Sequence, residues 1–513
     1  MLCPMKQSSG WWLALALVGC DPELEAGEPR FTVDGAANDA DSSRDGGGRD
    51  RGQPLDFLVD LGEVPGDASR DAVAQDAAVE DAATHDAAPG DAALDAESPP
   101  DAAPDMADPP DPPAEGPARY LAGRLHSPLT PWVRDQLRAI RARDPARQDD
   151  VFAKIGDSIT VSGSFLECFA GANVQLAGRD FLGDTINFFL GGDAAGGNPY
   201  TRESLAATVG WSAISALRGD PSPIDRELAA LDPRFAVVMF GTNDIQRNNI
   251  TAYADEMLDI VDLLLSQGVI PLLSSIPPRG DSAAADAQVP AYNAIVRGIA
   301  EGRQVPFVDL EMALRPLPNY GLAGDRLHGS TYQSGGRYLP CAFTEAGLQH
   351  GYNWRNLLTI EALHRVVGSV LGDVAPPDAP SPPRVGTGTP EDPLVIDALP
   401  YTHLADTREA PSDAFDAYPG CNAPQNEGGP EYVYRLDLDR PTTVRAMVFD
   451  RGTVDIDIHL LGGPDPARCL DRDHNGFEAS LEAGTWYFAL DTFMGADGQP
   501  DAGEFLFVLV QDP

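Results

Sequence analysis

Short apolar runs alternate with longer amphipathic segments through the middle of the chain, and this alternation constrains the fold more than any other feature. Between the runs lie segments such as 251–268, where apolar residues return every three or four positions and Gly268 supplies a stop. The pattern predicts a parallel sheet with helices on both faces, and ligands in such sheets bind beyond the carboxyl ends of the strands. The runs are VFAKI before Gly156, FAVVMF before Gly241, VIPLLSSI before Pro277 and VPFVDL around Phe307.

The segment before this region has the composition of a disordered tether. Residues 21–118 carry 26 Asp and Glu against 5 Arg, so about half of the net charge of −43 lies in less than a fifth of the 513 residues. Ala, Asp, Pro and Gly dominate, and such a tract cannot bury enough apolar surface to offset its chain entropy. The acidic balance and the lack of a basic patch argue against a nucleic-acid partner.

The N-terminus reads as an export signal. Residues 11–18 form an apolar run too short to cross a bilayer, and small residues follow it before Cys20. The stretch LVGC resembles the lipobox of bacterial lipoproteins, which implies a signal peptide over 1–20, lipidation of Cys20 and a membrane anchor. The alternative is a secretory signal with an incidental cysteine. Either interpretation predicts a cell-envelope or secreted protein.

The cysteines agree with export. If Cys3 is removed with the signal and Cys20 is lipidated, four remain, two in the middle of the chain and two near its end. They are candidates for disulfides in an oxidising compartment, although the sequence alone does not determine their pairing. No C-x-x-C or Cys/His cluster has zinc spacing, so we predict neither a metal nor a cofactor. The four are Cys168, Cys341, Cys421 and Cys469.

Three polar motifs follow the apolar runs in order: GDSIT at 156–160, GTNDI at 241–245 and DRLH at 325–328. The chain lacks the G-x-S-x-G of the α/β-hydrolase elbow. The three blocks instead resemble those of the SGNH or GDSL hydrolases, a superfamily of flavodoxin-like serine esterases. The resemblance covers about half of the chain, and we place this domain at 119–373.

The resemblance implies a site at these blocks. Ser158 would be the nucleophile, His328 the base that removes its proton, and Asp325 the residue that orients the imidazole. The backbone N–H groups of Ser158 and Gly210 and the side-chain amide of Asn243 would stabilise the oxyanion. Gly210 is chosen because an apolar segment ends there and a helical one starts.

Each of these residues also has a structural interpretation. Ser158 is expected to begin a helix, where it would serve as the N-cap. Asn243 and its neighbour are also common turn residues. His328 is preferred over the acid–His pairs at Glu361/His364 and Asp471/His474 because it follows the last predicted strand of the sheet. The aromatic residues Trp211, Tyr332, Tyr338 and Tyr352 are either a sugar platform or part of the core.

The C-terminal part changes pattern. Residues 374–393 form a Pro-rich linker that we expect to be extended. From 394 to 513, short alternating runs such as VDIDIHLL and GTWYFALDTF predict an all-β sandwich. These runs resemble the PPC domain of secreted bacterial hydrolases. Residues 471–482 match the spacing of an EF-hand loop, but a strand follows them, so we expect a β-turn there.

These features together predict an exported serine esterase that hydrolyses carboxylic esters through an acyl-enzyme on Ser158, with acylated carbohydrate as the candidate substrate. The alternative is a non-catalytic adhesion lipoprotein in which the hydrolase fold is only a scaffold. The acyl group and the alcohol cannot be read from the sequence.

Overall fold

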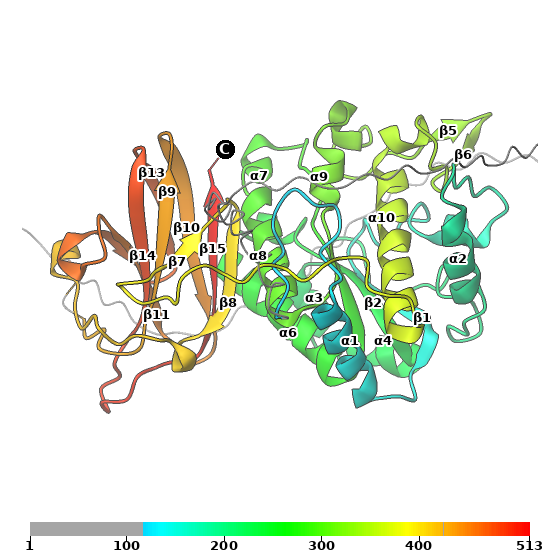
Figure 1. Cartoon of the computed structure of the whole chain (residues 1–513). Coiled ribbons are helices and arrows are strands. Elements are labelled where there is room, and N and C mark those ends of the chain that lie inside the picture. Colours follow the sequence, from blue (N-terminus) through cyan, green and yellow to red (C-terminus); the bar gives the residue numbers. More distant parts are fainter. Residues whose placement is uncertain (1–115, 424, 513) are drawn as a thin grey trace, which may run out of the picture. The chain divides into compact units, whose positions relative to one another are not determined.

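The computed structural model describes residues 116–423 and 425–512. The predicted signal segment with Cys20, and the predicted tether as far as residue 115, lie outside this range. Within the described part, no helix is both long and apolar enough to cross a membrane. Figure 1 shows an α/β part followed by an all-β part.

A parallel sheet forms the centre of the α/β part. The spatial order β1-β2-β3-β4 follows the chain, and Ala207 adds a short parallel bridge to Gly156 on the free side of β1. If the segment at Ala207 is counted as the second strand along the chain, the spatial order of the five strands is 2-1-3-4-5. This is the strand order of flavodoxin-like folds. The predicted fold class is confirmed. The strands are β1 (Gln148–Gly156), β2 (Pro233–Met239), β3 (Ile270–Ser274) and β4 (Phe307–Val308).

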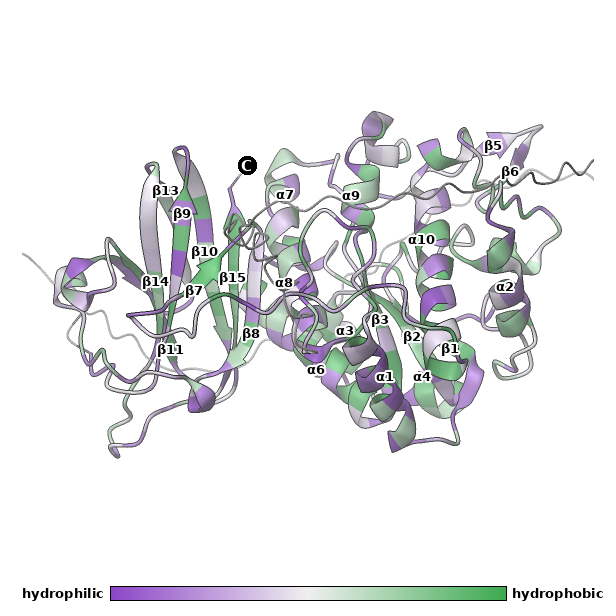
Figure 2. Cartoon of the chain, viewed as in Figure 1, coloured by the Kyte–Doolittle hydropathy of each residue, from purple (hydrophilic) through white to green (hydrophobic). Residues whose placement is uncertain are grey.

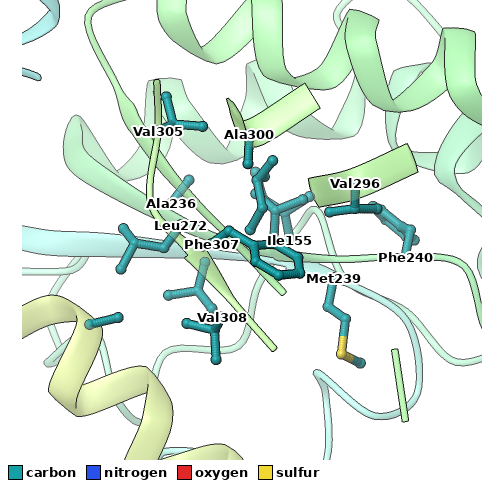
Figure 3. Packing of buried hydrophobic residues seen from close by; sticks show 14 of the residues in the cluster. Ile155, Ala236, Met239, Phe240, Leu272, Val296, Ala300, Val305, Phe307 and Val308 are labelled. Atoms are coloured by element: carbon teal, nitrogen blue, oxygen red, sulfur yellow. The ribbon is translucent and has the colours of Figure 1, made fainter. Parts of the chain in front are cut away.

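Helices cover both faces of this sheet, since every residue of β2 and β3 is buried. Helix α3 contacts α4 and α6, α6 contacts α8, and α10 contacts α2 and α9. Aliphatic and aromatic side chains from the strands and from α8 fill the core, as Figure 3 shows around Phe307. The helices are α1 (Pro131–Arg143), α2 (Gly183–Leu190), α3 (Ala213–Leu217), α4 (Pro223–Leu231), α5 (Asp244–Arg247), α6 (Ile250–Ser266), α7 (Ala283–Asp286), α8 (Val289–Arg303), α9 (Leu310–Leu314) and α10 (Gly351–Val366).

The C-terminal part is the expected β-sandwich. One sheet has the order β13-β10-β15-β8 and the other the order β12-β11-β14-β9-β7, and all pairs are antiparallel except β7 with β9. The strands are β7 (Leu394–Ile396), β8 (Tyr401–Asp406), β9 (Tyr432–Leu438), β10 (Thr442–Asp450), β11 (Ile456–Leu461), β12 (Cys469–Asp473), β13 (Gly476–Leu481), β14 (Gly484–Thr492) and β15 (Glu504–Gln511). A separate hairpin of β5 (Gln333–Ser334) and β6 (Arg337–Tyr338) belongs to the α/β part.

The sandwich shares a core with the α/β part. Along β15, residues 505, 507 and 509 point into the sandwich, whereas 506, 508 and 510 join the core of the sheet and its helices. Figure 2 shows β15 as hydrophobic along most of its length, as a strand buried on both faces requires. On α8, Gly298 and Gly302 permit close approach: a Cβ at Gly302 would lie 2.5 Å from the Cβ of Leu404.

The predicted linker runs over the surface of both parts. Residues 373–393 contain no helix or strand. Asp378 pairs with Arg365 of α10, and Arg384 pairs with Glu301 of α8. The segment is therefore irregular, as expected, but it is held by ion pairs to the part that precedes it. The domain boundaries at 118, 373 and 393 stay predictions.

Candidate active site

The structure brings Ser158, His328 and Asp325 together at the carboxyl end of β1. Ser158 lies in the turn after this strand, and the other two lie in the loop between Leu322 and Gly329, which are joined by an antiparallel bridge. Ser158 Oγ is 2.8 Å from His328 Nε2, and His328 Nδ1 is 2.6 Å from Asp325 Oδ2. These distances form one hydrogen-bonded chain from the hydroxyl to the carboxylate.

Backbone N–H groups of this loop fix the position of the Asp325 carboxylate. Asp325 Oδ1 accepts hydrogen bonds of 3.1 Å from the N–H groups of Leu327 and His328, and Oδ2 faces the imidazole. Partial burial acts to raise the pKa of Asp325, but the hydrogen bonds from His328 and from these two N–H groups outweigh it and hold the pKa below its usual value. An ionised carboxylate against Nδ1 keeps the proton there, so Nε2 presents its lone pair to Ser158.

The turn that carries Ser158 is not the start of a helix, so that expectation is wrong. Residues 158–160 form a turn, and the next helical residues belong to a 3-10 turn at Glu167–Ala170. The turn is stabilised from α10 instead: the buried Arg355 donates to Ile159 O at 2.6 Å and to Thr160 Oγ1 at 2.9 Å. Ile159 O and Thr160 Oγ1 bond to Arg355 on α10 and not to a following helical turn. The chain therefore forms a turn here and does not continue into a helix.

Gly156 makes this tight turn possible. A Cβ at position 156 would overlap Thr160 Oγ1 and would lie 2.7 Å from the carbonyl oxygen of Met239 on β2. Only glycine allows β1, β2 and the turn to approach this closely. The first residue of the GDSIT motif therefore has a steric role.

The buried Asp157 is a site residue that the sequence analysis did not single out. Its Oδ1 accepts from Ile159 N–H at 2.9 Å, and its Oδ2 is 3.5 Å from Asn243 Nδ2. Burial raises the pKa of Asp157 to about 6, against the opposing effects of Ile159 N–H and the positive charge of Arg355. Asp157 thus links the Ser158 turn to the Asn243 motif.

The three predicted oxyanion donors lie in neighbouring segments. Asn243 Nδ2 donates to Trp211 O at 2.8 Å, which places this side chain beside the residue that follows Gly210. Gly210 has φ +78°, a conformation that suits glycine. Among the described residues, the N–H groups of Ser158 and Gly210 have no hydrogen-bond acceptor.

Asp244 and Arg279 hold the loops around these donors, and the sequence analysis did not identify this role. Asp244 is buried and accepts from Ala213 N–H at 2.9 Å and from Gly241 N–H at 3.0 Å, which ties the Gly210 loop to the GTNDI motif. Burial raises the pKa of Asp244 to about 6. Arg279 donates to Thr242 O at 2.6 Å from the segment after β3. The sequence does show an acidic residue in GDSIT and in GTNDI, namely Asp157 and Asp244. That these two side chains are buried depends on tertiary packing and cannot be predicted from the motifs.

An open cleft lies along the segment that follows Ser158, and its lining includes none of the predicted catalytic or oxyanion residues. It has a volume of about 490 Å³ and is lined by Ser162, Ser164, Glu167, Asn173 and Tyr338, among others. Thr331, three residues after His328, donates to Ser164 Oγ at 2.9 Å, so the loop that carries His328 meets the cleft wall. Tyr338 is 69% exposed. Tyr352 is buried and belongs to the core, so it is not part of a sugar platform.

The four candidate cysteines form two disulfides, one in each part of the structure. Cys168 bonds to Cys341 and ties the segment after Ser158 to the chain beyond the β5–β6 hairpin. Cys421 bonds to Cys469 in the sandwich. The rival acid–His pairs have other partners: Glu361 contacts His126 and Arg179, and His364 contacts Thr185. At residues 471–482 the structure has the expected turn between β12 and β13.

Comparison with known proteins identifies the class. Residues 155–331, about a third of the chain, match the GDSL-like lipase/acylhydrolase family model. The fold, together with this match, defines a hydrolase that acts on ester bonds. The chain carries a GDSL-like lipase/acylhydrolase domain, followed by the β-sandwich.

The solved structures that match part of the chain include the following three. A GDSL-like lipase from Bacteroides thetaiotaomicron is 15% identical over 45% of this chain and 98% of its own, with a TM-score of 0.27. An acetylxylan esterase from Geobacillus stearothermophilus is 16% identical over 41% of this chain and 93% of its own, also at 0.27. An α/β hydrolase from the metagenome of Lake Arreo in Spain is 17% identical over 43% and 95%, at 0.28. No curated protein matches the chain.

Proposed function

We propose that the protein is an exported serine esterase that hydrolyses carboxylic esters through an acyl-enzyme on Ser158. The observation that carries the proposal is the hydrogen-bonded chain from Ser158 Oγ through His328 to Asp325, at 2.8 and 2.6 Å. A serine hydroxyl needs a base within hydrogen-bond reach to become a nucleophile, and His328 Nε2 meets that requirement.

The proposed reaction has two steps. Ser158 Oγ attacks the ester carbonyl while its proton passes to His328 Nε2, and His328 then gives that proton to the departing alkoxide, which leaves the acyl group on Ser158. Water deprotonated by His328 attacks the acyl-enzyme and releases the acid. Asp325 stays ionised and stabilises the imidazolium in both steps.

The oxyanion would lie among the N–H groups of Ser158 and Gly210 and the Asn243 amide. The two backbone donors have no acceptor among the described residues, so no existing bond must break when charge develops. Asn243 Nδ2 uses one N–H for Trp211 O at 2.8 Å, and its second N–H faces Asp157 Oδ2 across 3.5 Å, a long contact that this N–H would exchange for the oxyanion. Each such donor is worth about 3 to 4 kcal/mol of transition-state stabilisation.

Acylated carbohydrate is the proposed substrate. The open cleft offers serine hydroxyls, an amide, a carboxylate and the exposed Tyr338 ring, which suit a polar alcohol with apolar ring faces better than a long acyl chain. The acyl group is then expected to be small. A rate series over acyl chain lengths tests this: a sharp preference for acetate agrees, and a preference for eight carbons or more contradicts it.

Export is supported by the apolar run before Cys20 and by the two disulfides, which persist in oxidising compartments. Lipidation of Cys20 would anchor the chain in a cell-envelope membrane, with the acidic tract as a spacer. Mass spectrometry of protein from a bacterial host tests this. Mature chains that begin at a lipidated Cys20 agree, and unlipidated chains cleaved elsewhere contradict it.

A fluorophosphonate probe tests the serine esterase directly. The wild type is expected to be labelled once, and Ser158→Ala to lose labelling together with about 10⁶-fold in kcat, as other serine triads do. Ser162→Ala is the matched control for labelling, because Ser162 lies four residues away in the same segment and is outside the hydrogen-bonded chain. Equal labelling of Ser158→Ala, or none of the wild type, would favour the adhesion scaffold instead.

A further inference from the structure

Three segments of the sandwich bring metal-ligating side chains together, away from the esterase motifs in the sequence. Asp450 ends β10, Asp455 lies in the loop that follows, and His474 lies in the turn between β12 and β13. One ligand atom from each residue lies within 4.8 Å of the other two. The folded chain therefore places two carboxylates and an imidazole around one point.

A fourth residue points to a ligand at this place. Asp457 on β11 is only 2% exposed, and its Oδ1 is a buried oxygen without a hydrogen bond. This oxygen lies 3.3 Å from His474 Nδ1, and Asp455 Oδ1 lies 3.0 Å from the same nitrogen. A buried carboxylate oxygen without a donor is costly unless a cation is present.

An ordinary ion pair does not account for this arrangement. His474 Nδ1 carries at most one hydrogen, and neither carboxylate makes a directed hydrogen bond with it among the described residues. The other oxygen of Asp457 is already paired with Arg472. Three carboxylates thus lie near the one imidazole of His474, with Arg472 as the partner of Asp457.

The types of donor atom select the class of cation, and the distances are compatible with it. Ligand atoms about 2.0 to 2.1 Å from a tetrahedral Zn²⁺ are separated by about 3.3 Å, close to the two distances from His474 Nδ1. Calcium and magnesium prefer oxygen ligands only, whereas imidazole with carboxylates suits zinc and similar transition metals. We propose that Asp450, Asp455 and His474 form a site for a divalent transition-metal cation of the zinc class, with the buried Oδ1 of Asp457 beside His474.

This cation would join three segments and stiffen the contact with the α/β part. Arg451, next to Asp450, pairs with Asp259 and Asp262 of α6. A metal at Asp450 would fix the loop that presents Arg451 to this helix. The proposed role is thus structural, and binding should raise the thermal stability of the whole protein.

The proposed ligands differ from those that the EF-hand spacing at 471–482 would use. Asp473 Oδ1 accepts the N–H groups of Asn475 and Gly476 at 2.8 and 3.0 Å, so this oxygen closes the turn. Asp471 lies on the neighbouring strand and is exposed, outside the cluster. Asp471→Asn is therefore a control that changes the charge by the same amount as Asp455→Asn without removing a ligand.

The test is Zn²⁺ titration of the full chain after removal of metals with a chelator, by calorimetry and by thermal unfolding. We expect one equivalent at the sandwich site, a rise in Tm of about 3 °C or more at saturation, and at least tenfold weaker binding in His474→Ala and Asp455→Asn. Asp471→Asn should bind as the wild type does. Because His328 and Asp325 are a second possible Zn²⁺ site, equivalents are also counted in the His328→Ala protein.

Three results would overturn the proposal. The first is a wild type that binds no Zn²⁺ at 100 µM, a result that does not depend on any variant folding. The second is equal binding by wild type, His474→Ala and Asp455→Asn. The third is a rise in Tm with Ca²⁺ but none with Zn²⁺, which would assign the cluster to an oxygen-only cation.

Discussion

Replacement of Gly156 by alanine tests whether close packing around the Ser158 turn sets the activity. The added Cβ would overlap Thr160 Oγ1, and it would lie 2.7 Å from Met239 O and 2.9 Å from Thr160 Cβ. Non-bonded heavy atoms prefer about 3.5 to 4.0 Å, so the turn and β2 must separate by roughly 1 Å. Met239 O belongs to a central strand, and Thr160 is held by Arg355, so neither moves easily.

Two effects follow from this displacement. Ser158 is two residues away, and a misplacement of about 1 Å costs about 10²-fold in rate, so kcat should fall by about that factor with little change in KM. Overpacking of a tight core costs about 1 to 3 kcal/mol, so the free energy of unfolding should fall by that amount.

Hydrolysis of p-nitrophenyl acetate and urea unfolding measure the two effects. Gly163→Ala is the matched control, since its Cβ would meet nothing closer than the flexible Glu167 carboxylate at 3.4 Å. That variant should keep the kcat and stability of the wild type. If Gly156→Ala kept them as well, the steric explanation of the motif glycine would be wrong.

Three further predictions concern other parts of the site and its scaffold. Asp325→Asn should lower kcat on the order of 10³- to 10⁴-fold without weakening substrate binding, because an amide no longer holds the Nδ1–H tautomer of His328; steady-state kinetics measure it. Burial raises the pKa of Asp244 to about 6, so its folded form binds the proton more tightly than the unfolded chain, and that stability is lost as the pH rises from about 4 through 6. Between pH about 4.5 and about 7.5, the free energy of unfolding measured in urea should therefore fall by about 2 kcal/mol less for Asp244→Asn than for the wild type. Replacing Cys168 and Cys341 by serine opens a loop of 173 residues and should cost up to about 5 kcal/mol, seen as a lower urea midpoint.

Much of the fold was predictable from local pattern. The run FAVVMF became β2 and the periodic segment around Met257 became α6, because alternation of apolar residues directly reports burial and helical spacing. The structure also places Ser158 Oγ 2.8 Å from His328 Nε2, and Asn243 beside Asp157, as the meeting of the carboxyl ends of parallel strands at one edge predicts. The helix expected at Ser158 failed because Arg355, almost 200 residues later, supplies the competing hydrogen bonds.

The sequence by itself determined the parallel sheet, the sandwich and the order of the motif residues, because these depend on periodicity and on chain direction. Only the tertiary structure decided which charges are buried, such as Asp157 and Asp244, and that His474 meets Asp455 and Asp457. It also decided that β15 is covered on both faces, by the sandwich and by the helical part. The physical reason is that burial and convergence depend on residues far apart in the chain, whose distances are set only when the segments pack.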